Sequence, residues 1–302
     1  MRLPTVSVLM TAYNRRAFIA EAIESVLAQT FEDFELIVVD DASADGTLAA
    51  AKTSTRDPRV RLVCNERNLG DYPNRNRAAG LARGRYLKYV DADDAILPDC
   101  LAVMVGAMER HPTAALGLCK AVDGRWELPA ILSPREACRE HFLHRSLLHN
   151  APLSAIVRTE AFRAAGGFSP MRYVGDVDLW LRLAARWPVV LIRGGLTWWR
   201  SHDQQESRRE RADARAAGLR HAVALAALHD AVCPLTATER GEAIRRIKRR
   251  AARDVLRTLL TAGPRRAIRL LASAGLCWHE LARAFTAETP RHTPRLSRGV
   301  SS

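Results

Sequence analysis

The sequence of 302 residues has no run of about eighteen uncharged apolar residues, the length that a membrane-spanning helix needs. Its first apolar stretch, Val6 to Met10, is also too short for the hydrophobic core of a signal peptide. The six cysteines are widely separated and include no Cys-x-x-Cys pair, which argues against a zinc knuckle or a disulfide scaffold. We therefore expect a cytoplasmic protein whose cysteines are reduced thiols.

Glycine-rich phosphate loops are absent as well. Neither Gly-x-Gly-x-x-Gly nor Gly-x-x-x-x-Gly-Lys-[Ser/Thr] follows a strand-like segment, so the sequence supports neither a dinucleotide-binding fold nor a P-loop. A diphosphate ligand would then need a metal ion to hold it.

Positive charge is in excess, because 46 lysines and arginines face 33 aspartates and glutamates, for a net charge of +13. A protein of this charge can bind nucleic acid, anionic lipid or phosphorylated substrates. The distribution is uneven, with clustered aspartates early in the chain and many arginines late in it. We therefore expect different tasks for the two ends of the chain.

The first third of the chain alternates short β-branched runs with helix-like segments. Strands are predicted over 6–10, 35–39, 59–64 and 86–90, and helices over 18–29, from 45, and over 74–83. This alternation predicts βαβ units that form a mainly parallel, Rossmann-like sheet flanked by helices. Ligands bind beyond the carboxyl ends of such strands. Those ends carry the polar segments 11–14, 40–41, 65–70 and 91–94.

The rest of the chain is predicted to be more helical, apart from a short strand over 155–157. Helices are expected over 98–110, after a capping box at Ser133, over 176–187, after a second capping box at Thr236, and after Gly263-Pro264. We divide the chain into a domain over 1–204, a basic helical extension over 205–289, and a tail over 290–302. The Pro, Arg and Ser content of the tail predicts disorder.

An acidic cluster, Asp91-Ala92-Asp93-Asp94, directly follows the strand predicted over 86–90. Carboxylates this close repel one another and cost stability unless a cation compensates them. Mg²⁺ or Mn²⁺ is suited to this, because such an ion binds one or two carboxylates and adds water and substrate phosphates. The cluster therefore predicts a metal and phosphate site. A solvated turn, or a helix cap at Asp93 or Asp94, is the alternative.

These segments, taken together, closely resemble glycosyltransferase family 2, an inverting family with the GT-A fold. The resemblance runs from Val6 to about Ser207 and rests on VSVLMTAYN, EAIESVLAQTFEDFELIVVDDASADGT and NERNLGDYPNRNRAAGLARGRYLKYVDADD, in the family's order and spacing. It implies an enzyme of the bacterial polysaccharide type that uses a nucleotide-sugar donor, a UDP-sugar, with Mg²⁺ or Mn²⁺. The acceptor is expected to be a glycan or lipid-linked. Residues 1–100 are expected to bind the nucleotide and 101–204 the acceptor.

The resemblance implies a nucleobase pocket at the ends of the first two strands. Thr11, Ala12 and Tyr13 are expected to line it, with Tyr13 beside the base. Asp41 is expected to accept a hydrogen bond from the base, as acidic residues at strand ends do for nucleotides. Plain packing is the alternative for Tyr13.

The resemblance also implies the groups that hold the diphosphate. Asp93 is expected to be the direct metal ligand, with Asp91 a further ligand nearer the ribose or sugar. Arg75 is expected to approach the phosphates, unless it is a solvated helix residue. His202 ends a segment that resembles the family's Tyr-Arg-x-His, which makes it a third metal ligand, a diphosphate contact or a structural histidine.

The segment 165–182 resembles the family's Gly-Gly-[Phe/Tyr]…Glu-Asp-x-Asp-Leu-Trp-Leu-Arg pattern. Asp176 stands at the position of the catalytic base, which takes the acceptor proton as the hydroxyl oxygen attacks the anomeric carbon. Asp178 and Trp180 are expected to orient and pack that helix. Gly175 is a departure, because the family usually has Glu there.

Three other functions fit parts of the sequence. The pI of about 10.2 suggests a nucleic-acid-binding protein, which is not favoured because no zinc, RNP or helix-turn-helix signature accompanies it. A nucleotidyltransferase would usually carry a Gly-rich first loop, and an inactive donor-binding relative is raised only by Gly175. The Arg-rich C-terminal helices predict either a solvated face or peripheral attachment to an anionic membrane surface, which would be the inner face.

Overall fold

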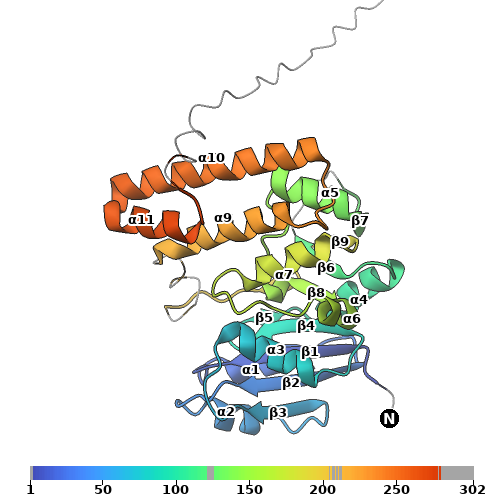
Figure 1. The fold of residues 1–302 in the computed structure, drawn as a ribbon. Coiled ribbons are helices and arrows are strands. Elements are labelled where there is room, and N and C mark those ends of the chain that lie inside the picture. The colour runs from blue at the N-terminus through green and yellow to red at the C-terminus, as the bar shows by residue number, and fades with distance from the viewer. Residues whose placement is uncertain are drawn as a thin grey trace, which may run out of the picture.

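The computed structural model describes residues 3–120, 126–203, 205, 208, 210, 213–277 and 279. This part of the chain holds an α/β domain with three helices packed on it toward the C-terminus (Figure 1). None of its helices is both long enough and apolar enough to cross a bilayer. The tail over 290–302, for which the sequence predicts disorder, lies outside the described residues.

Eight strands form the main sheet. They are β1 (Val6–Ala12), β2 (Phe34–Asp40), β3 (Val60–Cys64), β4 (Tyr86–Asp91), β6 (Leu116–Lys120), β7 (Ala130–Leu132), β8 (Ala155–Arg158) and β9 (Val189–Arg193). Their order is β3-β2-β1-β4-β8-β6-β9-β7, and the first four run parallel. β8 and β7 are antiparallel to their neighbours, and β5 (Ala95–Ile96) pairs separately with β10 (Thr197–Trp198). The predicted Rossmann-like, mainly parallel sheet is confirmed.

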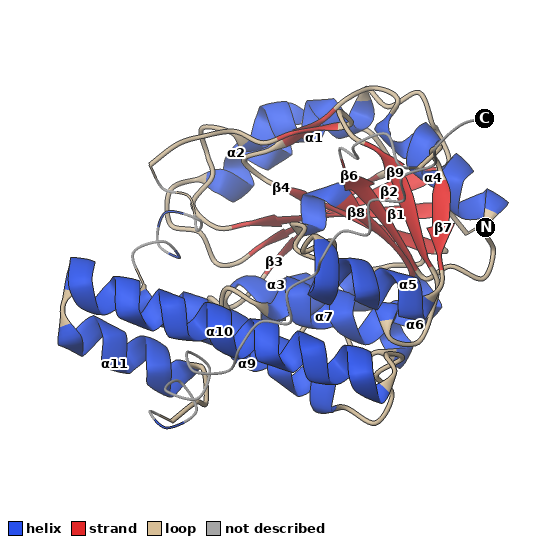
Figure 2. Cartoon of the chain, turned by 90° about the horizontal axis from the view of Figure 1, so that it is seen from above, coloured by secondary structure: helices blue, strands red, loops and turns tan. Residues whose placement is uncertain are grey.

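Helices cover both faces of the sheet (Figure 2). One face carries α1 (Ile19–Leu27), α2 (Thr47–Ser54) and α4 (Cys100–Arg110), and the other carries α3 (Asp71–Leu81), α5 (Pro134–Arg139), α6 (Thr159–Ala164) and α7 (Gly175–Ala184). Successive strand residues point to opposite faces, so Val8 and Met10 pack toward α1 and α4 while Leu9 packs toward α3 and α7. β1 and β2 are therefore apolar along nearly their whole length.

The second half of the sheet is where the sequence was least informative. β6 and β9 were not predicted, and β6 has glycine at its second position, which weakens its strand pattern. A Cβ atom at Gly117 would lie 2.8 Å from Ile156 Cγ2 and 2.9 Å from Ile192 Cδ1. The glycine that weakens the strand pattern is thus required by the isoleucines of the two neighbouring strands.

The C-terminal helices are α9 (Ala214–His229), α10 (Ala237–Ala262) and α11 (Pro264–Ser273). α9 lies against α7, and α10 and α11 pack on α9 around Leu225, Val255 and Leu270 (Figure 1). Thr236 caps α10 as predicted, with its hydroxyl oxygen accepting a hydrogen bond from the Glu239 N–H at 3.3 Å. The π-helical turn Glu140–His144 contacts α10, while the 3-10 turn Pro152–Ser154 precedes β8.

Candidate active site

The predicted donor-binding residues meet at the carboxyl ends of β1, β2 and β4. Thr11 lies opposite Asp91 across the β1–β4 pair, and Ala12 lies opposite Asp40 across the β1–β2 pair. β1 is also where the strand order reverses, because the chain moves outward to β2 and β3 and then returns to β4. Such a switch point opens a crevice at the strand ends, where ligands of α/β sheets bind.

Asp93 lies at the centre of the polar cluster at this edge. Its Oδ2 atom accepts a hydrogen bond from Arg15 Nε at 2.7 Å and lies 2.9 Å from His202 Nε2. The His202 ring stacks on Phe18 with ring centroids 4.8 Å apart, which fixes the orientation of the imidazole. A cavity of about 490 Å³ beside His202 is lined by Arg15, Phe18 and their neighbours.

Asp91 has a different partner from Asp93. Arg75 Nη2 donates to Asp91 Oδ1 at 2.6 Å, and Arg75 Nε donates to Asp71 Oδ1 at 2.7 Å. Burial raises the pKa of Asp91, and the charge of Asp93 adds to this, while Arg75 opposes it. Arg75 itself is 6% exposed, and its Nη1 atom is buried with no hydrogen-bond partner among the described residues. Arg75 is therefore not a solvated helix residue.

Asp94 turns away from the cluster. Its Oδ1 atom accepts a hydrogen bond from the Arg200 backbone N–H at 3.0 Å, which ties the loop after β10 to the end of β4. Burial raises the pKa of Asp94, and the charge of Asp91 raises it further. The Arg200 guanidinium continues outward to Glu21 and lies over Trp198. Asp94 thus holds in place the segment that carries His202.

Asp41 is almost completely buried, with 2% of its surface exposed. Its carboxylate accepts hydrogen bonds from Asn65 Nδ2 at 2.6 Å and from the backbone N–H groups of Leu69 and Gly70 at 2.8 and 2.9 Å. These bonds fix the loop between β3 and α3 against the end of β2. Tyr13, by contrast, is 46% exposed at the same edge, so it is not a core residue.

The residues present fit a divalent ion with two protein ligands better than one with three. Among the described residues, no three His, Cys, Asp or Glu side chains gather closely enough to hold a metal by themselves. Asp93 Oδ2 and His202 Nε2 lie 2.9 Å apart, within hydrogen-bonding distance, and a carboxylate oxygen with an imidazole nitrogen is a donor pair that a divalent ion such as Mn²⁺ would accept. Asp91 instead receives the Arg75 guanidinium.

Asp176 lies in the first turn of α7, apart from the polar residues at the ends of β1, β2 and β4. Tyr72 donates from its hydroxyl to Asp176 Oδ1 at 3.3 Å, and the Val177 N–H donates to the same oxygen at 2.7 Å. Burial raises the pKa of Asp176 to about 6, against the lowering effect of the Val177 hydrogen bond and the Arg75 charge. A carboxylate with this pKa is ionised at neutral pH and is basic enough to accept a proton.

Tyr72 was not identified from the sequence, and it explains Gly175. A Cβ atom at position 175 would lie 2.7 Å from Tyr72 Cε2 and 2.9 Å from the Ser169 carbonyl oxygen. The tyrosine ring therefore fills the space that a side chain at 175 would need. The signal was present in the sequence only as an unusual glycine, because nothing links position 175 to position 72 until α3 and α7 pack together.

The neighbours of Asp176 on α7 have structural partners. Asp178 Oδ2 accepts from Arg182 Nη2 at 2.8 Å, and Arg182 also donates to the Gly167 carbonyl oxygen at 2.7 Å. Trp180 is fully buried and donates from Nε1 to the Asn150 carbonyl oxygen at 2.8 Å. Both contacts agree with the expectation that Asp178 and Trp180 orient and pack the helix.

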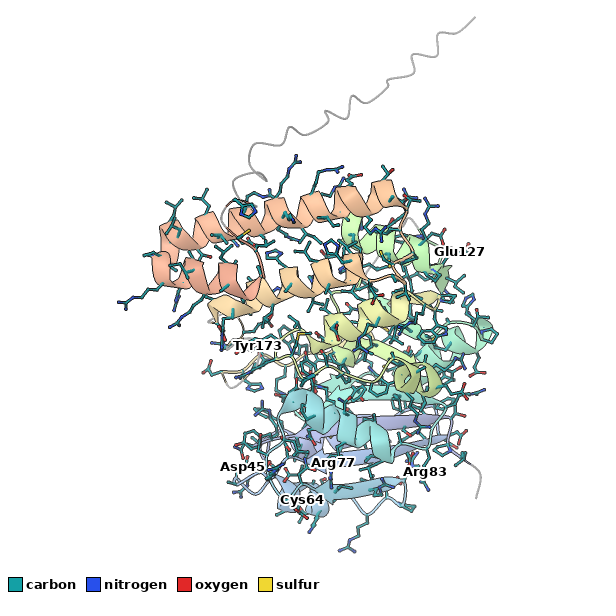
Figure 3. The ribbon with its side chains drawn as sticks, in the orientation of Figure 1. Asp45, Cys64, Arg77, Arg83, Glu127 and Tyr173 are labelled. Carbon is teal, nitrogen blue, oxygen red and sulfur yellow. The ribbon has the colours of Figure 1, made fainter. Side chains whose placement is uncertain are left out.

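A second, larger cavity of about 1190 Å³ opens beside Asp176. Its walls come from the π-helical turn Glu140–His144, the segment 146–151, α7, α9 and α10. Tyr173, just before α7, lines this cavity, and it lies at the left of Figure 3 on the same side as Asp45, which precedes α2, and Cys64, which ends β3. Sequence reasoning did not connect the C-terminal helices with Asp176, since that contact depends on how α9 packs on α7.

Comparison with known proteins places this chain in a family. The family model described as Glycosyl transferase family 2 matches residues 7–166. The putative glycosyltransferase EpsE of Bacillus subtilis (strain 168) is 32% identical over 192 residues, covering 59% of this chain and 66% of EpsE. The succinoglycan biosynthesis protein ExoO of Rhizobium meliloti (strain 1021) is 44% identical over 104 residues, covering 34% of this chain and 30% of ExoO. The matches thus span less than two thirds of these relatives.

Solved structures share the fold at low identity. TarS of S. aureus, residues 1–349 in complex with UDP-GlcNAc, aligns with a TM-score of 0.70 at 17% identity, over 93% of this chain and 81% of that one. The mannosyltransferase PcManGT of Pyrobaculum calidifontis, in complex with GDP-Man and Mn²⁺, aligns with a TM-score of 0.61 at 19% identity, over 96% and 78%. The fold is therefore the GT-A fold of glycosyltransferases, as the sequence predicts.

Proposed function

Because the chain belongs to glycosyl transferase family 2 and is therefore a glycosyltransferase, we propose that it moves a sugar from a nucleotide-diphosphate donor to an acceptor hydroxyl with inversion. The observation that carries this proposal is the position of Asp176. This carboxylate lies at the start of α7 beside the large cavity, and its pKa of about 6 suits a general base at neutral pH.

The donor is proposed to bind at the ends of β1, β2 and β4, within residues 1–100. Thr11, Ala12 and Tyr13 would line the base pocket, and Asp41 would face it from the end of β2. Arg75 supports a phosphate or sugar contact, because its buried Nη1 atom is a charged donor that has no partner among the described residues. We favour a UDP-sugar, since the TarS structure holds UDP-GlcNAc, although PcManGT holds GDP-Man.

Mg²⁺ or Mn²⁺ is proposed as the cofactor, with Asp93 and His202 as its ligands and Asp91 beside them. PcManGT was crystallised with Mn²⁺, which supports a divalent ion without choosing between the two. A bound metal acts as a Lewis acid that stabilises the departing nucleotide diphosphate. Arg15, whose Nε atom lies 2.7 Å from Asp93 Oδ2, supplies a second positive charge at the same place.

The acceptor is proposed to enter through the cavity beside Asp176, within residues 101–204 and the extension over 205–289. The acceptor hydroxyl would lose its proton to Asp176 as its oxygen forms the bond to the anomeric carbon. The bond from that carbon to the nucleotide diphosphate breaks at the same time, and the diphosphate leaves with the electron pair. Attack opposite the leaving group inverts the configuration.

A peripheral membrane contact is proposed for the ends of α10 and α11. Leu256, Leu259, Leu260 and Ile268 are exposed there, with Leu260 at 77%. Arg265, Arg266 and Arg269 lie on the same short helix as Ile268. A cationic, apolar helix end of this kind suits an anionic bilayer surface, and a glycan or lipid-linked acceptor would then be reached from the cytoplasmic side.

The test is a donor screen across nucleotide sugars with Mn²⁺, with hydrolysis and transfer measured separately. Asp93→Asn should weaken donor turnover, and Asp176→Asn should lower kcat by about 10²–10⁴ while leaving donor binding intact. Asp57→Asn, at the opposite end of the sheet, is the matched control. If no donor is turned over, or if Asp93→Asn leaves turnover unchanged, the enzymatic proposal fails.

A further inference from the structure

Five arginines of α10 line the large cavity. They are Arg246, Arg249, Arg250, Arg253 and Arg257, and their spacing of three, one, three and four residues places them on one side of the helix. Arg245, the residue directly before them in the sequence, does not line the cavity. A basic helix face that only contacts solvent would not need its arginines to lie along one cavity.

The cavity wall has more positive charge than its own acids neutralise. Six arginines line it, against three carboxylates, those of Asp176, Glu210 and Asp254. Glu210 pairs with Arg220, while Asp254 lies 3.0 Å from His221 and 3.1 Å from Arg257. Like charges gathered in a concave space raise its potential and attract an anion.

Arg250 and Arg253 are two guanidiniums that this pairing leaves over, whereas Arg249 has an interaction of its own. Within the part of the chain that the structure describes, neither makes an ion pair with a carboxylate, whereas Arg246 pairs with Glu242 at 2.6 Å. Both are exposed to the cavity. Arginine presents parallel N–H donors that match the oxygens of a phosphate group.

The pKa values of two histidines in the same cavity wall are lowered by burial and by nearby positive charges. The pKa of His149 is lowered to about 4 by burial first, and then by the charges of Arg220 and Arg250. The pKa of His141, whose ring lies 5.4 Å from that of His149, is lowered by burial first, and then by the charges of His149, Lys120 and Arg250. Both imidazoles are therefore neutral at pH 7, and an anion bound beside them would raise the pKa of His149.

We propose that this cavity binds the phosphate or diphosphate group of a phosphorylated acceptor, held by Arg220, Arg250 and Arg253, with the reacting hydroxyl at Asp176. The proposal rests on the proposed function, because it takes Asp176 as the base that faces the acceptor. It is separate from the donor site, since the arginines that line this cavity are not those of the β1–β4 edge. The acceptor class is thus a sugar phosphate or a lipid-linked sugar diphosphate.

The first test measures anion binding without any reaction. Inorganic pyrophosphate is titrated into the full chain without divalent metal, and the pKa of His149 is followed by NMR. We expect pyrophosphate to raise this pKa, and the double variant Arg250→Gln/Arg253→Gln to weaken its binding at this site at least about tenfold. Arg245→Gln, on the same helix, should bind like the unmodified protein. An unchanged His149 pKa, or equal binding by the double variant, would overturn the proposal.

The second test separates the acceptor from the donor. Transfer is compared for a polyprenyl-diphosphate-linked sugar in detergent, a soluble sugar phosphate, and the same sugar without phosphate. We expect kcat/KM to require the phosphate and to fall at least about tenfold in the double variant, while hydrolysis of the nucleotide sugar by water stays unchanged. Equal use of the unphosphorylated sugar would overturn the proposal. If the unmodified protein hydrolyses no nucleotide sugar, the result would instead overturn the proposed function.

Discussion

A carboxylate removed from water resists ionisation, and Asp176 shows the consequence for activity. Its pKa is raised to about 6, so it gains a proton as the pH falls below that value. We expect kcat/KM to fall tenfold per pH unit below about pH 6, because only the ionised form accepts the acceptor proton. The pH profile of transfer at subsaturating acceptor measures this, and a flat profile between pH 5 and 7 would contradict Asp176 as the base.

The same shift links Asp176 to stability. The folded protein holds this proton more tightly than the unfolded chain does, because the pKa rises from 3.8 to about 6 on folding. The free energy of unfolding should therefore decrease as the pH rises through this interval, by about 3 kcal/mol from this group. Asp176→Asn should remove that decrease, so that the inactive variant is the more stable protein at pH 7.

Tyr72 tunes this base, because its hydroxyl donates to the ionised carboxylate. Tyr72→Phe removes the donor, and the pKa of Asp176 should then rise further. We expect the acid limb of kcat/KM to move up by about 0.4–1 pH unit, the equivalent of one hydrogen bond of about 0.5–1.5 kcal/mol. Tyr86→Phe, whose hydroxyl binds Glu109 instead, should leave the limb in place. A downward or absent shift would mean that Tyr72 only packs.

Individual site residues were predictable to the extent that their roles depend on nearby sequence. Asp93 and His202 were identified from motifs, and the structure places their side chains in contact. Tyr72, His149 and the cavity-lining arginines were not identified, because each acquires its role from an element more than a hundred residues away or from the packing of α9 and α10. The residues next to each of these positions in the sequence do not indicate such contacts.

At the scale of elements, α3 and α7 pack closely because residue 175 of α7 is a glycine. The ring of Tyr72 packs where a Cβ atom at Gly175 would be. Gly175→Ala should force the ring aside and lower the free energy of unfolding by about 1–3 kcal/mol, as overpacking does. Chemical denaturation measures the change.

The control for this substitution is Gly106→Ala in α4, where nothing lies within 4 Å of the added methyl group. That change should be neutral or stabilising, since alanine favours helix over glycine. The double variant Tyr72→Ala/Gly175→Ala should lose less stability than the two single changes add up to. Additive losses would show that the two positions do not compete for the same space.

Strands and helices of the parallel half followed from the alternation of apolar runs, because both faces of β1 and β2 are buried. Capping boxes at Ser133 and Thr236 located the starts of α5 and α10. β6 and β9 were not recognised, because they lie in the part of the chain where strands and helices no longer alternate regularly. Gly117 also lowers the strand signal of β6, for the packing reason that its neighbours impose.

At the scale of the whole molecule, the two ends of α10 differ in how many large apolar side chains they expose. α10 has 26 residues and so spans about 39 Å at 1.5 Å per residue. Its C-terminal end and α11 expose leucines and Ile268 among arginines, whereas the loop before its N-terminal end exposes Val232 alone among the large apolar residues. An anionic bilayer should therefore contact one end only.

Sedimentation with vesicles tests this orientation. We expect the full chain to bind vesicles that contain anionic lipid and not those of neutral lipid, with affinity that falls as salt rises, because Debye screening shortens the reach of the arginines. Leu260→Asp/Ile268→Asp should abolish binding, since it places two charges where the bilayer would receive apolar side chains. Val232→Asp, at the other end of α10, should bind normally. If both variants bind vesicles alike, the membrane contact is not at the C-terminal end of α10. Transfer to a soluble sugar phosphate should be unaffected in both variants.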